Sequence, residues 1–150
     1  MGYRKKDFPM GGDNTWATTD MIICRSFRID CGAQAAGTAT TERFKAGSVI
    51  FAFRAKVTEA VSGTTSTVQL GFTGTTMLSA ATAEATLVAN YIFGNANNID
   101  ACVMVLSTDD TFDCIVGVNT LTAGKFDVDV YYAPPPEGVL GAEFKQYTTE

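Results

Sequence analysis

The sequence contains no histidine, and this absence removes several kinds of chemistry at once. Nucleophilic catalysis of the Ser-His-Asp or Cys-His type needs an imidazole base, and zinc sites use histidine or regularly spaced cysteines. The four cysteines have spacings that match no zinc pattern: Cys24, Cys31, Cys102 and Cys114. We therefore expect a protein that is not an enzyme and that uses no cofactor or metal.

Long apolar runs and an excess of positive charge are also lacking. No uninterrupted apolar stretch approaches the ~18 residues of a membrane span, and the N-terminus does not lead into the apolar stretch of a secretory signal. The net charge of −5 opposes sequence-independent binding to nucleic acid, because such binding needs rows of cations that displace counterions from phosphates. We therefore expect no membrane or nucleic-acid partner, assembly in the cytoplasm, and reduced cysteines.

What the sequence does contain favours β-structure. Its 150 residues suffice for one domain, which at this size buries roughly 68–70% of its unfolded surface. Threonine, alanine, valine and phenylalanine are abundant, there are 14 glycines, and lysine, glutamate and leucine are scarce. β-Branched and aromatic residues fit the pleated surface of a sheet, so the composition indicates strands and tight turns rather than helices.

Residues 1–20 predict an extended N-terminal arm. They combine three consecutive basic residues, a proline and a glycine pair, and they cannot form a core of their own. Within residues 1–45 seven basic residues outnumber five acidic ones, so this part of an acidic chain is slightly positive. Either the basic residues belong to a solvated tail, or the arm lies on the acidic surface of a partner. Trp16 is expected to dock on its own domain or on a neighbouring subunit.

Alternating apolar and polar residues predict the first strands. Residues 21–29 alternate imperfectly, as an edge strand does, and residues 30–41 are rich in turn-forming residues and predict a loop. Residues 48–60 are the clearest strand, and after a Ser/Gly/Thr turn residues 67–72 alternate again, which predicts a β-hairpin. The predicted core face of the clearest strand is Val49, Phe51, Phe53, Ala55 and Val57.

The second half of the chain shows the same kind of pattern. Residues 73–89 predict a short helix or an insertion between strands, and residues 101–106 form an apolar run. Residues 111–118 would place Phe112, Cys114, Val116 and Val118 on one face. Residues 125–132 alternate strictly, with Phe126, Val128, Val130 and Tyr132 inward and with Asp127 and Asp129 outward.

Three prolines, residues 134–136, end the domain, because proline cannot donate to a ladder of strands. The remaining residues either pack back on the domain or reach a neighbour. Short strands with turn signals every ~8–12 residues are typical of a sandwich or barrel. We predict an all-β, antiparallel β-sandwich of jelly-roll or Greek-key type over residues 21–133, flanked by extended arms at 1–20 and 134–150.

Carboxylates are the remaining candidates for hydrolysis or for a calcium site. Asp109, Asp110 and Asp113 form the densest acidic cluster, and Asp127 and Asp129 share one strand face. Glycoside hydrolysis needs two carboxylates about 5–10 Å apart across a cleft, and a dedicated calcium loop has a regular Asp/Asn/Gly spacing that is absent. The simpler interpretation is that the cluster shapes a turn and that the pair keeps a sheet face soluble.

Residues 53–71 and 121–132 resemble small structural proteins of tailed bacteriophages. In those proteins a strand that ends in a Thr-Glu-Ala-like element turns through Gly and Thr into a second strand, and the last strand follows a Thr-Ala-Gly-Lys-like turn. The resemblance covers about a fifth of the chain. It implies a component of the virion, such as a head decoration protein, a head-fibre base or a tail-associated subunit, and it brings no active site.

Three functional hypotheses follow. The first is a capsid decoration or cement protein, a homotrimer on the capsid exterior that bridges neighbouring major capsid subunits. The second is a tail-associated or fibre-associated protein that contacts the host surface, and the third is a carbohydrate-binding module or weak glycosidase. For the first, the expected partner-binding residues lie in the two arms: Arg4, Lys5, Lys6, Phe8, Trp16, Phe144 and Tyr147.

Overall fold

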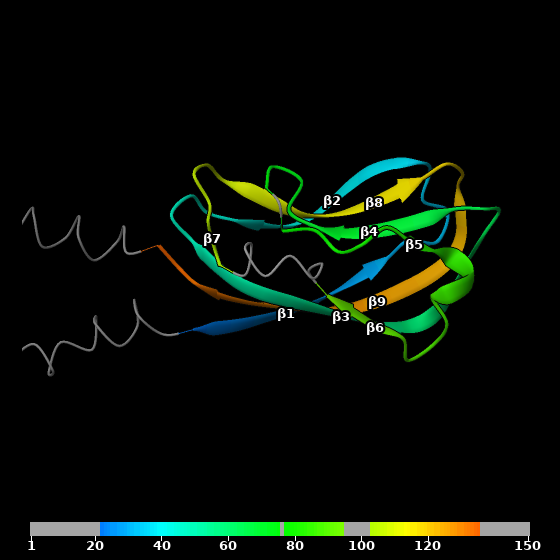
Figure 1. The fold of residues 1–150 in the computed structure, drawn as a ribbon, viewed down its shortest axis with the longest axis horizontal. Helices are drawn as coiled ribbons and strands as arrows, with labels where there is room; N and C mark the ends of the chain where they lie inside the picture. Colours follow the sequence, from blue (N-terminus) through cyan, green and yellow to red (C-terminus); the bar gives the residue numbers. More distant parts are fainter. Residues whose placement is uncertain (1–21, 76, 95–102, 136–150) are drawn as a thin grey trace, which may run out of the picture.

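The computed structural model describes residues 22–75, 77–94 and 103–135, which form two antiparallel sheets packed face to face (Figure 1). The first sheet has the order β1-β9-β3-β6, with β7 also pairing with β3, and the second has the order β2-β8-β4-β5. The prediction of an all-β sandwich is confirmed. The strands are β1 (Ile23–Asp30), β2 (Gly37–Phe44), β3 (Val49–Gly63), β4 (Thr67–Gly71), β5 (Thr82–Ala83), β6 (Ile92–Gly94), β7 (Met104–Val105), β8 (Asp110–Gly117) and β9 (Leu121–Ala133).

The strands pair in a nested order. β1 pairs with β9, β2 with β8, β3 with β6 and β4 with β5, and every pair is antiparallel. The early strands of the domain therefore pair with the late strands. These pairs alternate between the two sheets, since β1–β9 and β3–β6 lie in the first sheet and β2–β8 and β4–β5 lie in the second. Because Ile23 lies opposite Tyr132, the described domain begins and ends at the same end of the sandwich (Figure 1).

One hydrophobic core fills the space between the sheets. Phe112 of β8 is fully buried at its centre, and three rings meet it edge-on with centroid distances of 5.0–5.4 Å: Phe27, Phe53 and Phe72. Edge-on contacts add to the apolar area that these rings bury. The core therefore joins residues from both sheets into one cluster.

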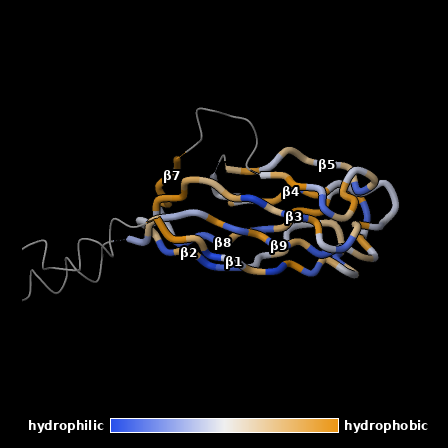
Figure 2. The backbone as a smooth tube through the Cα atoms, turned by 90° about the horizontal axis from the view of Figure 1, so that it is seen from below, coloured by the Kyte–Doolittle hydropathy of each residue, from blue (hydrophilic) through white to orange (hydrophobic). Residues whose placement is uncertain are grey.

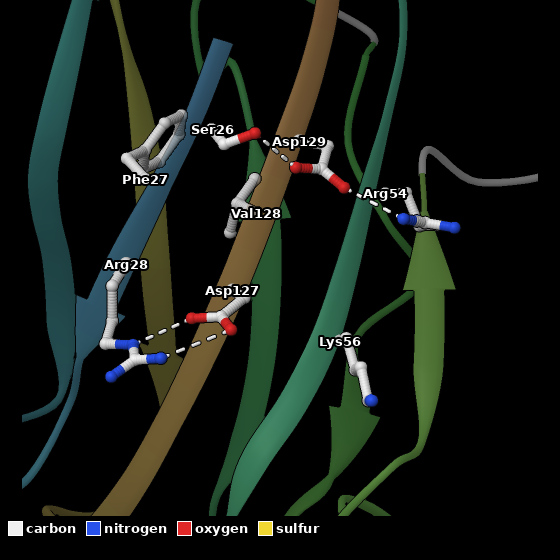
Figure 3. Close-up of a pocket in the computed structure, with 8 residues that line it drawn as sticks. All are labelled: Ser26, Phe27, Arg28, Arg54, Lys56, Asp127, Val128 and Asp129. Atoms are coloured by element: carbon white, nitrogen blue, oxygen red, sulfur yellow. Dashed lines mark hydrogen bonds and ion pairs between the residues drawn. The ribbon is translucent and has the colours of Figure 1, made fainter. Parts of the chain in front are cut away.

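Strand β9 follows the predicted alternation. Phe126, Val128 and Val130 are fully buried, and Tyr132 packs against the core. Asp127 and Asp129, between them, point to the outer face (Figure 3). Figure 2 shows hydrophobic and hydrophilic residues following one another along the strands, as expected for a sheet with one dry face and one wet face.

Strand β3 departs from the prediction at its start. Phe53 and the later predicted core positions are buried, but Val49 and Phe51 are only half-buried, and Ile50 is fully buried instead. The pairing with β9 shifts between Ile50 and Ala52, so a β-bulge reverses the two faces of the strand there. All residues around the bulge are apolar, which is why the alternation could not reveal it.

Three expectations about the connections are wrong. The predicted loop 30–41 contains the first half of β2. Segments 48–60 and 67–72 form no hairpin, because β3 lies in the first sheet and β4 in the second. Val118 is exposed, since β8 ends at Gly117 and the chain turns there with a positive φ of 74°. Alternation predicts which side of a strand faces a core, but it does not predict which sheet the strand joins.

The alanine- and threonine-rich segment 73–89 is an insertion between strands, as one of the two predicted alternatives states. It contains β5 and one 3₁₀ turn, η1 (Glu84–Thr86). The Glu84 carboxylate accepts hydrogen bonds from the backbone N–H groups of Thr65 and Ser66, at 3.0 and 3.2 Å, and so holds the crossover from β3 to β4. No helix in the described part of the chain is long and apolar enough to cross a membrane.

Three of the four cysteines lie in the described ranges, and these three form no disulfide there. Cys31 and Cys114 are buried, and the loss of solvation raises the pKa of their thiols to about 11 and about 12, respectively. Both are therefore neutral at physiological pH and poor nucleophiles. Cys24 is exposed on β1, and Cys102 lies outside the described residues.

Replacing Phe112 by alanine tests the aromatic cluster. We expect the free energy of unfolding to fall by about 3–5 kcal/mol, because the substitution removes a buried ring and leaves a cavity between the sheets. Urea unfolding followed by circular dichroism measures the change. Val88→Ala, at a side chain that is 56% exposed, is the control and should change stability by less than ~0.5 kcal/mol. Equal effects of the two substitutions would contradict the assigned core.

Candidate functional site

The outer face of the first sheet carries three cross-strand rows of polar and charged side chains. Directly opposed residues of antiparallel strands point to the same side, so β9 places one charged residue between partners from β1 and β3 in each row. The first two rows line a hollow of about 570 Å³ (Figure 3). The rows are Ser26–Asp129–Arg54, Arg28–Asp127–Lys56 and Asp30–Lys125–Glu59.

Both aspartates of this face are held by hydrogen-bond donors. Asp129 accepts a bond of 2.6 Å from the Ser26 hydroxyl and one of 2.9 Å from Nη2 of Arg54, and these bonds lower the pKa of its carboxyl. Asp127 accepts bonds of 2.7 and 3.3 Å from Nε and Nη2 of Arg28, which likewise lower its pKa. Charge-assisted bonds of this kind favour the ionised carboxylate.

The hydrogen bonds of the outer face therefore do not suit its two aspartates to the role of general acid. A general acid needs a carboxyl whose pKa is raised toward the working pH, whereas the pKa values of Asp127 and Asp129 are lowered. The charges of the three rows are largely compensated within the face itself. This arrangement agrees with the interpretation that the two aspartates keep a sheet face soluble.

The acidic cluster at the start of β8 does not converge on one point. Asp109 pairs with Arg43 at 2.7 Å, whereas Asp113 is buried and accepts hydroxyl bonds of 2.5 and 2.7 Å from Thr73 and Thr111. The third carboxylate of the cluster bonds to the backbone of its own strand. Across residues 22–75, 77–94 and 103–135, no group of three or more His, Cys, Asp or Glu side chains is placed to hold a metal ion.

The structure shows where the described domain begins and ends, and the partner-binding residues predicted in the two arms lie outside it. The described domain begins at Ile22, before β1, and ends at Pro135, after β9. Since β1 and β9 are neighbours, both ends of the described domain lie at one end of the sandwich, and both predicted arms would start there. The predicted residues all lie outside the described ranges: Arg4, Lys5, Lys6, Phe8, Trp16, Phe144 and Tyr147.

A pocket of about 210 Å³ lies beside the arm bases, and the sequence reasoning did not find it. We call it the arm-end pocket. One feature of the sequence pointed to this pocket, because Arg25 is a charged residue on the otherwise apolar face of residues 21–29. In the structure Arg25 points inward, and its guanidinium carbon lies 5.2 Å from the centre of the Phe44 ring. The lining residues come from segments far apart in the sequence: Arg25, Arg43, Phe44, Lys45, Ser48, Tyr132, Pro134 and Pro135.

The rim of the arm-end pocket is held by ionic contacts. Arg25 forms an ion pair with Glu42 and donates a bond of 2.9 Å to the backbone carbonyl of Arg43. Arg43 in turn pairs with Asp109. These contacts tie β1 to β2 at the edge of the sandwich and fix two guanidinium groups around an apolar wall.

Comparisons with known proteins place the fold. No protein-family model and no curated protein sequence matches the chain. A chain in the capsid asymmetric unit of cyanophage Pam1 is similar, with a TM-score of 0.55 and 15% identity over 76% of this chain and 85% of that one. A chain in the capsid of Ralstonia phage GP4 has a TM-score of 0.55 and 14% identity over 77% and 86% of the two chains. At these identities the likeness shows a shared fold.

Acidification should weaken the outer face. The folded-state pKa values of Asp127 and Asp129 are lowered, so their contribution to stability is present above the unfolded pKa and is lost as pH falls through the folded pKa. We expect the free energy of unfolding to decrease between about pH 5 and pH 2. Urea titrations at several pH values measure this decrease.

Asp129→Asn should make the same titration shallower, because its carboxylate no longer changes charge. Glu150→Gln makes an equal change in charge outside the described domain and should leave the slope as in the unsubstituted protein. An Asp129→Asn variant with the original pH dependence would show that the hydrogen bonds from Ser26 and Arg54 do not favour the ionised form.

Proposed function

We propose that the protein is a non-enzymatic structural component of a bacteriophage particle and that it acts as a capsid decoration or cement protein. In this role it bridges neighbouring major capsid subunits on the capsid exterior, after assembly in the host cytoplasm. Two observations support the proposal: the fold is shared with chains in two phage capsid structures, and both arms join the sandwich at one end.

The observation that best supports this proposal is that both arms would start from the same end of the sandwich. If both arms bind the shell, a single contact end faces it, and the rest of the sandwich stays free of it. The C-terminal segment, residues 136–150, could span at most about 50 Å if fully extended. An arm of that reach can contact a subunit beyond the one beneath the domain. Two arms with one origin are therefore suited to joining adjacent subunits.

The arms supply the residue types that such contacts need. Arg4, Lys5 and Lys6 would lie on acidic shell surface, where charge steers and orients association. Aromatic residues bury large areas and dominate binding at the centre of interfaces, so they would be the anchors: Phe8, Trp16, Phe144 and Tyr147. Repeated over a symmetric shell, individually weak contacts gain strength through avidity.

The finer features of the proposal concern the class of sandwich and the assembly. We assign the nested pairing of β1 with β9, β2 with β8, β3 with β6 and β4 with β5 to the jelly-roll class. We also propose a homotrimer, since a closed ring of identical copies would present several pairs of arms to the shell at once.

Deletion of residues 1–20 tests the contribution of the N-terminal arm. We expect binding to undecorated shells to weaken at least tenfold, about 1.4 kcal/mol, because the basic and aromatic contacts are lost while the domain stays intact. Co-sedimentation with purified shells measures the binding. Lys56→Ala, on the outer sheet face, is the matched charge control and should bind as the full chain does. Undiminished binding of the shortened chain would contradict a role for this arm.

The copy number per particle tests the location. A cement protein should occur at a copy number comparable to that of the major capsid protein, because it occupies repeated positions on the shell. Quantitative mass spectrometry of purified particles gives this ratio. A ratio typical of a tail or fibre component would instead support the tail-associated role, and absence from the particle would contradict both.

A further inference from the structure

We propose that the arm-end pocket binds the C-terminal segment of a neighbouring copy of this chain, with Phe144 against its apolar wall and the Glu143 carboxylate at Lys45. The inference rests on the proposed role of the arms as contacts between molecules, and it names the partner of one arm. It assigns Phe144 to a contact between identical copies and leaves the N-terminal arm and Tyr147 to the contacts with the shell.

The size and wall of the arm-end pocket suit a single side chain with adjoining backbone. Its volume of about 210 Å³ corresponds to roughly seven water molecules at ~30 Å³ each. This is smaller than the ~300–1,000 Å³ of most cofactor and small-molecule sites. The wall is built from the rings of Phe44 and Tyr132, whose centroids lie 5.0 Å apart, and from Pro134 and Pro135. An aromatic side chain would extend this cluster by one ring.

The charge of the pocket favours an acidic occupant. Arg25 and Arg43 form ion pairs with Glu42 and Asp109, whereas Lys45 forms no ion pair with any described residue and acts on Asp109 only through its charge. The pocket and its ion-pair partners therefore carry three cations and two carboxylates, a net charge of +1 on a chain whose net charge is −5. A carboxylate beside the bound ring would supply the missing partner.

A buried hydroxyl in the pocket also lacks a partner. Ser48 is 1% exposed, and its Oγ is the one buried side-chain oxygen or nitrogen atom among the described residues that forms no hydrogen bond. The turn around it is rigid, because the Ser48 N–H bonds to the Lys45 carbonyl at 3.1 Å and the Ser48 carbonyl accepts from the Leu106 N–H at 2.9 Å. Burying an unsatisfied hydroxyl costs about 1–3 kcal/mol. A backbone or carboxylate oxygen of an incoming segment would recover that cost.

The C-terminal segment has the matching chemistry. Residues 136–150 contain three glutamates and one lysine, a net side-chain charge of −2, and within them Glu143 precedes Phe144 directly. The N-terminal arm also has an acidic residue before an aromatic one, Asp7 and Phe8, but two lysines stand immediately before them. Charge complementarity with the pocket therefore selects the C-terminal segment.

The chain geometry favours a neighbouring copy over the same copy. Pro134 and Pro135 line the pocket, and a proline at position 136 restricts Pro135 to extended backbone shapes. A chain that leaves the pocket in this way must reverse before its own Phe144 can return to it. A contact from the tail of one copy to the pocket of the next is heterologous, and it forms a ring where the rotation between copies closes. The trimer proposed above is one such ring.

The purified full-length chain tests the proposal through its self-association. Sedimentation equilibrium should show oligomers that dissociate at least tenfold more readily in Phe144→Ala and in Lys45→Glu, since one loses the anchor and the other reverses the charge of its partner. The double variant Lys45→Glu with Glu143→Lys should regain association. Lys56→Glu is the matched charge control and should associate as the unsubstituted chain does, and Phe8→Ala tests the N-terminal arm as the alternative occupant. Circular dichroism checks that each variant is folded.

Ser48→Ala separates the hydroxyl contact from simple packing. It should weaken association and, in the dissociated chain, raise the free energy of unfolding, because it removes an unsatisfied group. A photo-crosslinker at position 144 identifies the bound copy when heavy-isotope and light-isotope chains are mixed. Crosslinks from a heavy to a light chain at Tyr132 or Lys45 support the proposal.

Three results would overturn the proposal: crosslinks confined to single chains, a monomeric chain at all concentrations, or unchanged association in both Phe144→Ala and Lys45→Glu. A loss of association in Phe8→Ala alone would assign the pocket to the N-terminal arm instead. Because no shell is present in these measurements, their failure leaves the shell-binding result intact, and the reverse also holds.

Discussion

The pairing of the first strand with the last is the constraint on which the rest of the structure depends. β9 lies between β1 and β3 over most of its length, so it forms backbone hydrogen bonds to both neighbours. Its side chains point alternately into the core and toward solvent on the outer face. Its inward residues complete the core, and its outward residues form the middle of each charged row. The same pairing brings the bases of the two arms together and forms one wall of the arm-end pocket. The core, the outer face and the arm-end pocket therefore depend on one register.

The two faces of the first sheet contribute unequally to stability. Exposed ion pairs such as Arg28–Asp127 contribute little to stability because solvent screens them, whereas fully burying one large apolar side chain contributes about 1.5–3 kcal/mol. The buried apolar side chains of the inner face thus contribute more to stability than the ion pairs of the outer face. The charged rows act mainly on specificity, because a shift of β9 by one residue would carry Asp127 and Asp129 into the core. Both faces therefore favour the same register of β9, the inner face through burial of apolar side chains and the outer face through exclusion of charge from the core.

The sequence predicted those parts of the fold in which apolar and charged residues strictly alternate. Residues 125–132 satisfy this condition, and their faces are as expected. The bulge near Phe51 escaped detection because its surroundings are uniformly apolar, and the hairpin was wrongly predicted because alternation carries no information about which sheet receives a strand. The arm-end pocket could not be predicted for a related reason. Its walls come from segments that only the pairing of β1 with β9 and the packing of β2 bring together, and Arg25 on an apolar face was the single local sign.

The shared origin of the arms also determines how the domain responds to mechanical force. A force that pulls Ile22 and Pro135 apart acts across β1 and β9, so it opens their ladder progressively from the Ile23–Tyr132 end, one pair of hydrogen bonds after another. A force that pulls both ends in the same direction is parallel to the two strands and is distributed over all their bonds to the rest of the sheet. The sandwich should therefore yield easily when Ile22 and Pro135 are pulled apart across the sheet. It should resist more strongly when both residues are pulled together along the strands.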